Sequence, residues 1–214
     1  MKVSKETSKF VAESGINLEI LFAGRSNVGK SSLIKELFGA DVKVGRRPGV
    51  TLRPLHIKFS DLLVTDMPGF GFMSGVKDRK QDIVKDQIVH YIEKNAKRIK
   101  IGVLVIDAPS FPEIVERWDS KAQIPIDIEM FDFLKELGID TLIAANKMDK
   151  ISESKSDILL DEVVSRMGFQ PPWNNWKHLI APISAKKGDL IALRSLLRGR
   201  LHEMKRDDLL KYLS

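Results

Sequence analysis

The sequence predicts an α/β fold in which a mostly parallel sheet carries helices between its strands. Short apolar runs alternate along the chain with longer segments whose apolar residues recur at helical spacing, which is the pattern of repeated strand–helix units. A glycine-rich loop, Gly24-(four residues)-Gly29-Lys30-Ser31, stands between the first apolar run and the first helical segment. The chain has 214 residues, which suits one such domain with a sizeable core. Because ligands of parallel sheets bind at the carboxyl ends of the strands, we expect the chemistry where the apolar runs end.

Six apolar runs of strand length predict the strands, at residues 18–23, 55–59, 62–64, 101–106, 141–145 and 179–183. The first run is apolar almost throughout, as in a strand that is buried on both faces of a parallel sheet. The second run alternates apolar and polar residues and follows Pro54. It therefore predicts an edge or antiparallel strand with one face in water.

Five segments with apolar residues at helical spacing predict helices, at residues 33–38, 83–96, 128–137, 158–167 and 189–205. Gly39 is placed to end the first helix. Residues 40–50 and 70–78 show no periodicity and are expected to be loops. Residues 108–125 carry three prolines and are expected to form a long connection.

The composition is that of a soluble globular protein, with 30% charged and 43% hydrophobic residues. No apolar stretch is long enough to cross a membrane, and no secretory signal is visible. The absence of cysteine excludes a disulfide framework and a thiolate metal site. We expect a cytoplasmic protein without a membrane partner, in which a flexible lead-in over residues 1–16 precedes a single domain over residues 17–214.

The formal net charge of +6 is unevenly distributed. Residues 42–60 contain five basic side chains and no acid, and a second basic stretch covers residues 94–100; the basic residues are Lys43, Arg46, Arg47, Arg53, Lys58, Lys94, Lys97, Arg98 and Lys100. Such clusters fit a polyanion partner such as RNA, and they equally fit a well-solvated surface. No RNA-binding signature accompanies the charge.

Residues 23–32, AGRSNVGKSS, predict a phosphate site. A loop with this glycine spacing turns successive backbone N–H groups into one hollow and then enters the N-terminus of a helix, whose dipole adds positive charge. Glycine is needed at 24 and 29 because a side chain would either demand a forbidden backbone angle or keep phosphate oxygens at a distance. Lys30 supplies a cation for the outer phosphates, and the Ser31 hydroxyl is a hard oxygen ligand that suits Mg²⁺.

Two acidic motifs follow at the ends of later strands, Asp66-Met67-Pro68-Gly69 and Asn146-Lys147-Met148-Asp149. We expect the Asp66 carboxylate to hold a water of Mg²⁺ and the Gly69 N–H to reach the terminal phosphate. The Asp149 carboxylate can accept hydrogens from the ring N–H and the exocyclic amine of guanine, whereas adenine offers no such donor pair. The set predicts GTP as the ligand. A P-loop kinase would leave the Asn146–Asp149 motif unexplained.

Taken together, these motifs resemble the EngB (YihA-like) family of translation-factor-type P-loop GTPases. The resemblance covers residues 18–205 and is carried by Gly24–Ser32, Pro48-Gly49-Val50-Thr51, Asp66-Met67-Pro68-Gly69-Phe70-Gly71-Phe72, Asn146–Asp149 and Ser184-Ala185-Lys186. It implies a Ras-like fold with a six-stranded, mostly parallel sheet and helices on both faces. It also implies Thr51 as the second protein ligand of Mg²⁺, and a frame around the guanine from Ser184 to Lys186. Residues 108–125 depart from the family pattern.

The residues that the resemblance and the motifs together place on the nucleotide lie in five segments. They are Gly24, Arg25, Ser26, Asn27, Val28, Gly29, Lys30, Ser31, Ser32, Gly49, Val50, Thr51, Asp66, Met67, Pro68, Gly69, Asn146, Lys147, Met148, Asp149, Ser184, Ala185 and Lys186.

Lys30, Thr51 and Gly69 are the expected catalytic residues, and no general base is identified. Many relatives carry glutamine directly after Asp-x-x-Gly, but Phe70 stands here and can neither orient nor deprotonate water. We therefore expect slow intrinsic GTP hydrolysis. Three ways to complete the site stay open: K⁺ bound at Asn27, as in similar GTPases, stimulation by a partner, or an arginine supplied in cis from Arg46, Arg47 or Arg53.

We expect a monomeric GTP/GDP switch, whose loops around Thr51 and Phe70 order on the terminal phosphate and relax after hydrolysis. EngB-like proteins are associated with assembly of the large ribosomal subunit and with cell division and septation, and the basic clusters fit rRNA better than the division apparatus. The alternative is a regulatory switch that recruits a protein effector. In that case Trp173 and Trp176 would form an exposed hydrophobic contact rather than cap the edge of a core.

Overall fold

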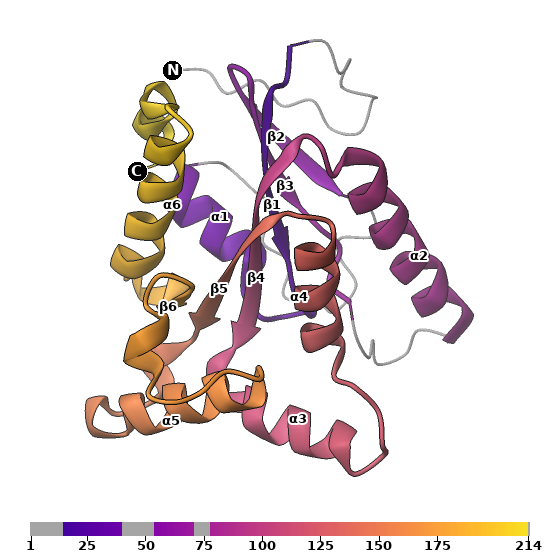
Figure 1. Cartoon of the computed structure of the whole chain (residues 1–214), viewed down its shortest axis with the longest axis vertical. Coiled ribbons are helices and arrows are strands. Elements are labelled where there is room, and N and C mark those ends of the chain that lie inside the picture. The colour runs from indigo at the N-terminus through magenta and orange to yellow at the C-terminus, as the bar shows by residue number, and fades with distance from the viewer. Residues whose placement is uncertain (1–14, 40–53, 71–77, 214) are drawn as a thin grey trace.

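The computed structural model describes residues 15–39, 54–70 and 78–213 and contains one six-stranded sheet with the strand order β2-β3-β1-β4-β5-β6 (Figure 1). The strands are β1 (Leu18–Ala23), β2 (Leu55–Phe59), β3 (Leu62–Asp66), β4 (Ile99–Asp107), β5 (Asp140–Asn146) and β6 (Ile180–Pro182). The α-helices are α1 (Lys30–Phe38), α2 (Asp78–Asn95), α3 (Phe111–Asp119), α4 (Ile126–Glu136), α5 (Glu153–Arg166) and α6 (Ile191–Glu203). Short 3₁₀ turns are η1 (Ala108–Ser110), η2 (Met148–Lys150), η3 (Trp173–Trp176), η4 (Ala185–Lys187) and η5 (Asp207–Tyr212).

The sheet confirms the predicted fold class. β1 lies at its centre and pairs in parallel with β3 on one side and β4 on the other. β5 and β6 continue the parallel pairing. β2 is the exception, because it is an edge strand that runs antiparallel to β3 after the turn at Ser60-Asp61. Both the edge position and the antiparallel direction agree with the alternating pattern of residues 55–59.

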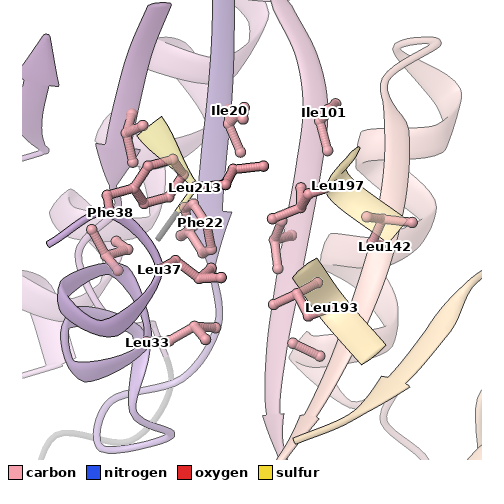
Figure 2. Close-up of a cluster of buried hydrophobic side chains, with 14 of the residues drawn as sticks. Ile20, Phe22, Leu33, Leu37, Phe38, Ile101, Leu142, Leu193, Leu197 and Leu213 are labelled. Carbon is pink, nitrogen blue, oxygen red and sulfur yellow. The ribbon is translucent and has the colours of Figure 1, made fainter. Parts of the chain in front are cut away.

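Alternate residues of β1 face two separate cores, one on each side of the sheet. Ile20 and Phe22 belong to the core on the side of α1 and α6, in the cluster of Figure 2 that also contains Leu33, Leu37 and Leu197. Leu21 and Ala23 face the opposite layer, which is built from α2, α3, α4 and α5. A strand buried on both faces has no polar alternation, which explains why residues 18–23 are apolar except for the buried Glu19.

The connection expected over residues 108–125 is wrong in part, because η1 and α3 lie within it. Pro109 and Pro112 fall in the first turn of η1 and α3 respectively, where a backbone N–H has no partner inside the helix. Phe111 and Val115 are buried and anchor α3 on the sheet. Pro109 and Pro112 therefore mark the starts of two helices, and not the irregular connection that the sequence predicted.

Helix starts also differ from the prediction. α2 begins at Asp78 rather than at residue 83, α4 at Ile126 rather than at residue 128, and α5 at Glu153 rather than at residue 158. For α2 and α5 the expected bounds began at the first apolar residue, whereas the first turns of these two helices are polar. Gly39 adopts a left-handed conformation and ends α1 as predicted. Within the described part of the chain, no helix is both long and apolar enough to span a bilayer.

Several predicted features lie outside the described residues. They are most of the lead-in over residues 1–16, most of the loop after Phe70, and Lys43, Arg46, Arg47, Gly49, Val50, Thr51 and Arg53.

Candidate nucleotide-binding site

The sequence-predicted site residues that the structure describes gather at one edge of the sheet. The glycine-rich loop follows β1, Asp66 ends β3, Asn146 ends β5 and Ser184 follows β6. The arrowheads of β1, β4 and β5 point to the same edge in Figure 1. Parallel pairing therefore brings together segments that are separated by up to 160 residues, counted from Gly24 to Ser184.

The loop backbone requires glycine at two positions for steric reasons. Gly24 has φ 146° and Gly29 has φ 101°, both in the range that favours glycine. A Cβ atom at Gly24 would overlap the carbonyl oxygen of Val105 in β4, and one at Gly29 would overlap the side-chain amide of Asn146. The N-terminus of α1 has no side-chain cap, so its first N–H groups suit an anion.

Lys30 lies within the hollow of this loop. Its side chain is almost buried, with 7% of the residue exposed, and its Nζ donates to the carbonyl oxygens of Gly24 and Arg25 at 2.9 Å each. Burial lowers the pKa of the Lys30 ammonium to about 8, although the carboxylates of Asp66 and Asp127 oppose the shift. A bound phosphate would supply the negative charge that this buried ammonium lacks.

Ser31 and Asp66 form the part of the site that fits Mg²⁺. The Ser31 Oγ donates to Asp66 Oδ2 at 2.5 Å, and Asp66 is buried. Asp66 Oδ1 has no hydrogen-bond partner among the described residues, and burial raises the pKa of this carboxyl. Two adjoining hard oxygens with an unsatisfied carboxylate match the preference of Mg²⁺, which takes its remaining ligands from water and phosphate.

The segment after Asp66 packs closely on the glycine-rich loop. Gly69 lies against Ser26, where a Cβ atom would come within 2.7 Å of the Ser26 Cα. The Ser26 N–H donates to the Phe70 carbonyl at 3.2 Å, and the Phe70 N–H donates to the Gly24 carbonyl at 3.4 Å. The Phe70 side chain is 3% exposed and, like that of Met67, belongs to the hydrophobic core. Its ring therefore takes no part in positioning water.

Asn146 and Lys147 connect the loops of the site to one another. The buried Asn146 donates from Nδ2 to the Val28 carbonyl at 2.7 Å and accepts the Ala185 N–H at 3.0 Å. Lys147 Nζ donates to the Asn27 carbonyl at 2.7 Å and pairs with Asp107 Oδ2 at 2.5 Å. Both side chains hold the glycine-rich loop against the segments that follow β5 and β6.

Asp149 lies in η2, directly beside the segment after β6. Its Oδ1 accepts a hydrogen bond from the Ser184 Oγ at 2.6 Å. That hydrogen bond lowers the pKa of Asp149, so the carboxylate is ionised and can only accept. Ala185 is buried and Lys186 is exposed in η4. Guanine, which can donate two hydrogens to the Asp149 carboxylate, suits this position better than adenine, which cannot.

The sequence interpretation missed two acidic residues of the site. Asp107 ends β4 at the same sheet edge and pairs with Lys147. Asp127, in the first turn of α4, is buried and lies 3.6 Å from Arg25 Nη1. Asp107 could have been found from its place directly after an apolar run, but no local pattern marks Asp127.

Other predicted surfaces are partly occupied by internal contacts. Trp173 is buried, its Nε1 donates to Asp157, and its backbone N–H donates to Asp161. The exposed-contact interpretation is therefore wrong for Trp173, which caps the edge of the core. Arg98 pairs with the buried Glu19, whereas Lys94, Lys97 and Lys100 are exposed.

Comparison with known proteins agrees with this geometry. Residues 19–147 match the family described as 50S ribosome-binding GTPase. The chain is 76% identical over 208 residues to a probable GTP-binding protein EngB of Methanosarcina mazei, covering 97% of this chain and 100% of that protein. It is 75% identical to its counterpart in Methanosarcina barkeri, covering 97% and 99% respectively. The crystal structure of a probable GTP-binding protein EngB superimposes with a TM-score of 0.74 at 44% identity, over 88% of this chain and 99% of the other.

Proposed function

The chain belongs to the EngB family of GTP-binding proteins, which are GTPases, and we propose that it acts as a Mg²⁺-dependent GTP/GDP switch in assembly of the large ribosomal subunit. One observation carries the nucleotide part of this proposal. The buried Lys30 ammonium within the glycine-rich loop and the Asp149 carboxylate beside Ser184 lie at the same sheet edge, as a phosphate site and a guanine site must.

We assign the contacts to the nucleotide as follows. The loop from Gly24 to Ser32 would hold the phosphates through its N–H groups and Lys30. Ser31, Asp66 and Thr51 would hold Mg²⁺, which neutralises charge on the phosphates when bound. Asp149 would select guanine, framed by the segment from Ser184 to Lys186. Calorimetric titration with Mg²⁺ present tests the assignment, because GTP and GDP should bind and ATP should not. Equal affinity for ATP would contradict it.

We further propose that the isolated protein hydrolyses GTP slowly. The supporting observation is Phe70, whose apolar ring is buried in the core and cannot orient an attacking water. Single-turnover hydrolysis in sodium buffer should be slow, and the proposal fails if it is fast. Repeating the assay with K⁺ separates the remaining explanations. Acceleration would favour a cation at the exposed Asn27, and no change would leave stimulation by a partner or an arginine supplied in cis.

The ribosomal partner is supported by the family match and by the exposed lysines at 94, 97 and 100. Sedimentation with purified ribosomal subunits should show binding to the large subunit with a non-hydrolysable GTP analogue and much less with GDP. Replacing these three lysines by glutamine should weaken binding, whereas replacing the exposed Lys121, Lys150 and Lys155 should not. Sedimentation with neither subunit in either nucleotide would favour a switch that recruits a protein effector. Because EngB-like proteins are associated with division, we also propose that depletion disturbs cell division and septation.

A further inference from the structure

A buried ion pair joins the glycine-rich loop to α4. Asp127 is 1% exposed, and Arg25 Nη1 lies 3.6 Å from its Oδ2. Neither Asp127 oxygen has a hydrogen-bond partner among the described residues, and the same holds for Arg25 Nη1. Burying the Asp127 charge without a hydrogen bond is costly, and the charge of the partly exposed Arg25 offsets part of that cost.

Open space on one side of the pair shows that packing alone does not hold Arg25 in place. A cavity of about 230 Å³ lies between the glycine-rich loop, the end of β4 and α3, and both Arg25 and Asp127 line it. The other charged residues that line it, Asp107 and Lys147, are paired with each other. The α3 side contributes only uncharged residues, Ser110, Phe111 and Ile114. The Arg25 side chain therefore has room to move, and the Asp127 charge is the attraction that opposes such a movement.

The backbone of Arg25 is the point where the catalytic elements meet. Its carbonyl oxygen accepts one of the two hydrogen bonds that fix Lys30 Nζ. Its backbone also forms an isolated parallel bridge with Phe70, the residue after Asp-x-x-Gly. A displacement of Arg25 would thus move the carbonyl oxygen that accepts from Lys30. It would also move the segment at Phe70, which follows the predicted contact with the terminal phosphate at Gly69.

We infer that Asp127 is a positioning residue for the phosphate loop, whose ionised carboxylate holds Arg25 and thereby the carbonyl that orients Lys30 for nucleotide binding. The inference rests on the proposed function, because it assigns a residue to the same nucleotide site. Asp127 lies in α4 and acts on the phosphate loop chiefly through Arg25, while its charge also favours the ammonium form of Lys30.

The ionised state of Asp127 is disfavoured by the fold. Burial raises the pKa of the Asp127 carboxyl to about 6, against the opposing charges of Arg25 and, more distantly, Lys30. Glu129, the other acid in the first turn of α4, pairs with Lys85 at the surface. Because the folded protein prefers a neutral residue at 127, an isosteric amide there should not lower the melting temperature at neutral pH.

The experiment compares Asp127→Asn with the matched surface change Glu129→Gln, and measures the dissociation constant of a fluorescent GDP with Mg²⁺ together with thermal melting. At pH 7.5 we expect Asp127→Asn to bind GDP about tenfold more weakly while melting no lower than the wild type. Glu129→Gln should match the wild type in both measurements, and Asp127→Glu should recover part of the affinity. A residue with only a structural role would lower melting and leave the affinity of the folded protein unchanged.

The pH profile supplies a second readout. The ratio of wild-type to Asp127→Asn affinity cancels the titration of the nucleotide itself. This ratio should fall from about ten at pH 7.5 toward one at pH 5, because protonated Asp127 no longer attracts Arg25. If Asp127→Asn binds GDP as tightly as the wild type at pH 7.5, the inference is overturned and the proposed function stands. Failure of the wild type to bind guanine nucleotides would instead remove the proposed function.

Discussion

Three buried ionisable side chains, Lys30, Asp66 and Asp127, lie around the phosphate loop. Burial shifts the pKa of each in the direction that favours the neutral form of the side chain. The pKa of Lys30 is lowered, whereas those of the two carboxyls are raised. Phosphate would restore the charge of Lys30, and Mg²⁺ would restore that of Asp66. At the scale of the residue, burial disfavours the charged forms of Lys30 and Asp66, and a phosphate and Mg²⁺ would each favour the charged form of its partner.

The Lys30 shift predicts that nucleotide binding takes up a proton above neutral pH. With a pKa of about 8 in the free protein, Lys30 is mostly deprotonated at pH 8.5, and bound phosphates raise its pKa again. Calorimetric titration with GDP and Mg²⁺ at pH 8.5, in buffers of different ionisation enthalpy, should show uptake of about three-quarters of a proton. Affinity should correspondingly decline as the pH rises beyond 8. Lys30→Arg, whose guanidinium stays charged, is the control and should show no uptake. Identical heats in all buffers for the wild type would contradict the prediction.

Asp149→Asn should abolish the preference for guanine. The amide places a donor where the carboxylate accepts, so a guanine donor would be left unpaired. We expect GDP affinity to fall by at least about a hundredfold, with ADP unchanged, in competition against a fluorescent nucleotide. Asp189→Asn is the matched control, because this exposed acid lies beside Ser184 and undergoes the same change of charge. Retention of guanine preference by Asp149→Asn would remove Asp149 from base recognition.

At the scale of the element, Asn146 joins two loops of the site that follow different strands. Its side chain forms hydrogen bonds with the Val28 carbonyl in the glycine-rich loop and with the Ala185 N–H in η4. The same side chain leaves no room for a Cβ atom at position 29. The first residue of the Asn-Lys-x-Asp motif is therefore a structural link between the phosphate side and the base side.

Asn146→Ala removes both of these hydrogen bonds and leaves a buried carbonyl and a buried N–H without partners. We expect a loss of about 2–4 kcal/mol in the free energy of unfolding, measured by urea denaturation, together with weaker GDP binding. Asn174→Ala, in the exposed part of η3, should change neither quantity. Unchanged stability of Asn146→Ala would show that water replaces the amide without cost.

The elements also show what could be predicted from the sequence. All six strands were located, because runs such as residues 101–106 are buried on both faces and stay apolar throughout. Helix starts were missed where the first turn is polar, as in α5, and α3 was missed because Pro112 lies where a helix tolerates it. Asp66 and Asp149 were predicted from motifs, and the structure places Asp66 at the end of β3 and Asp149 in η2 beside Ser184. Asp127 was not found, because its partner Arg25 is about a hundred residues earlier and only the folded chain brings them together.

At the scale of the whole molecule, the two ends of the sheet hold different kinds of polar structure. The carboxyl end carries the loops of the site, whereas the amino ends of β1 and β4 carry a closed network around Glu19. Glu19 is fully buried and accepts from the Thr65 Oγ1 at 2.6 Å, the Tyr91 hydroxyl at 2.8 Å and the Arg98 Nε at 2.9 Å. The network thus ties β1 to β3, to α2 and to the start of β4.

Glu19→Ala should therefore destabilise the fold without impairing the site. The change removes the Glu19 acceptor shared by the Arg98 guanidinium, the buried Thr65 hydroxyl and the half-buried Tyr91 hydroxyl, and we expect the free energy of unfolding to fall by about 3–5 kcal/mol in urea. The exposed pair between Glu162 and Arg166 provides the control, since Glu162→Ala should cost at most about 1 kcal/mol. GDP affinity of the folded Glu19→Ala protein should stay near that of the wild type, because the loops at the carboxyl end keep all their mutual contacts. A large loss of affinity at unchanged stability would mean that the network acts on the site across β1, rather than holding the layers of the molecule together.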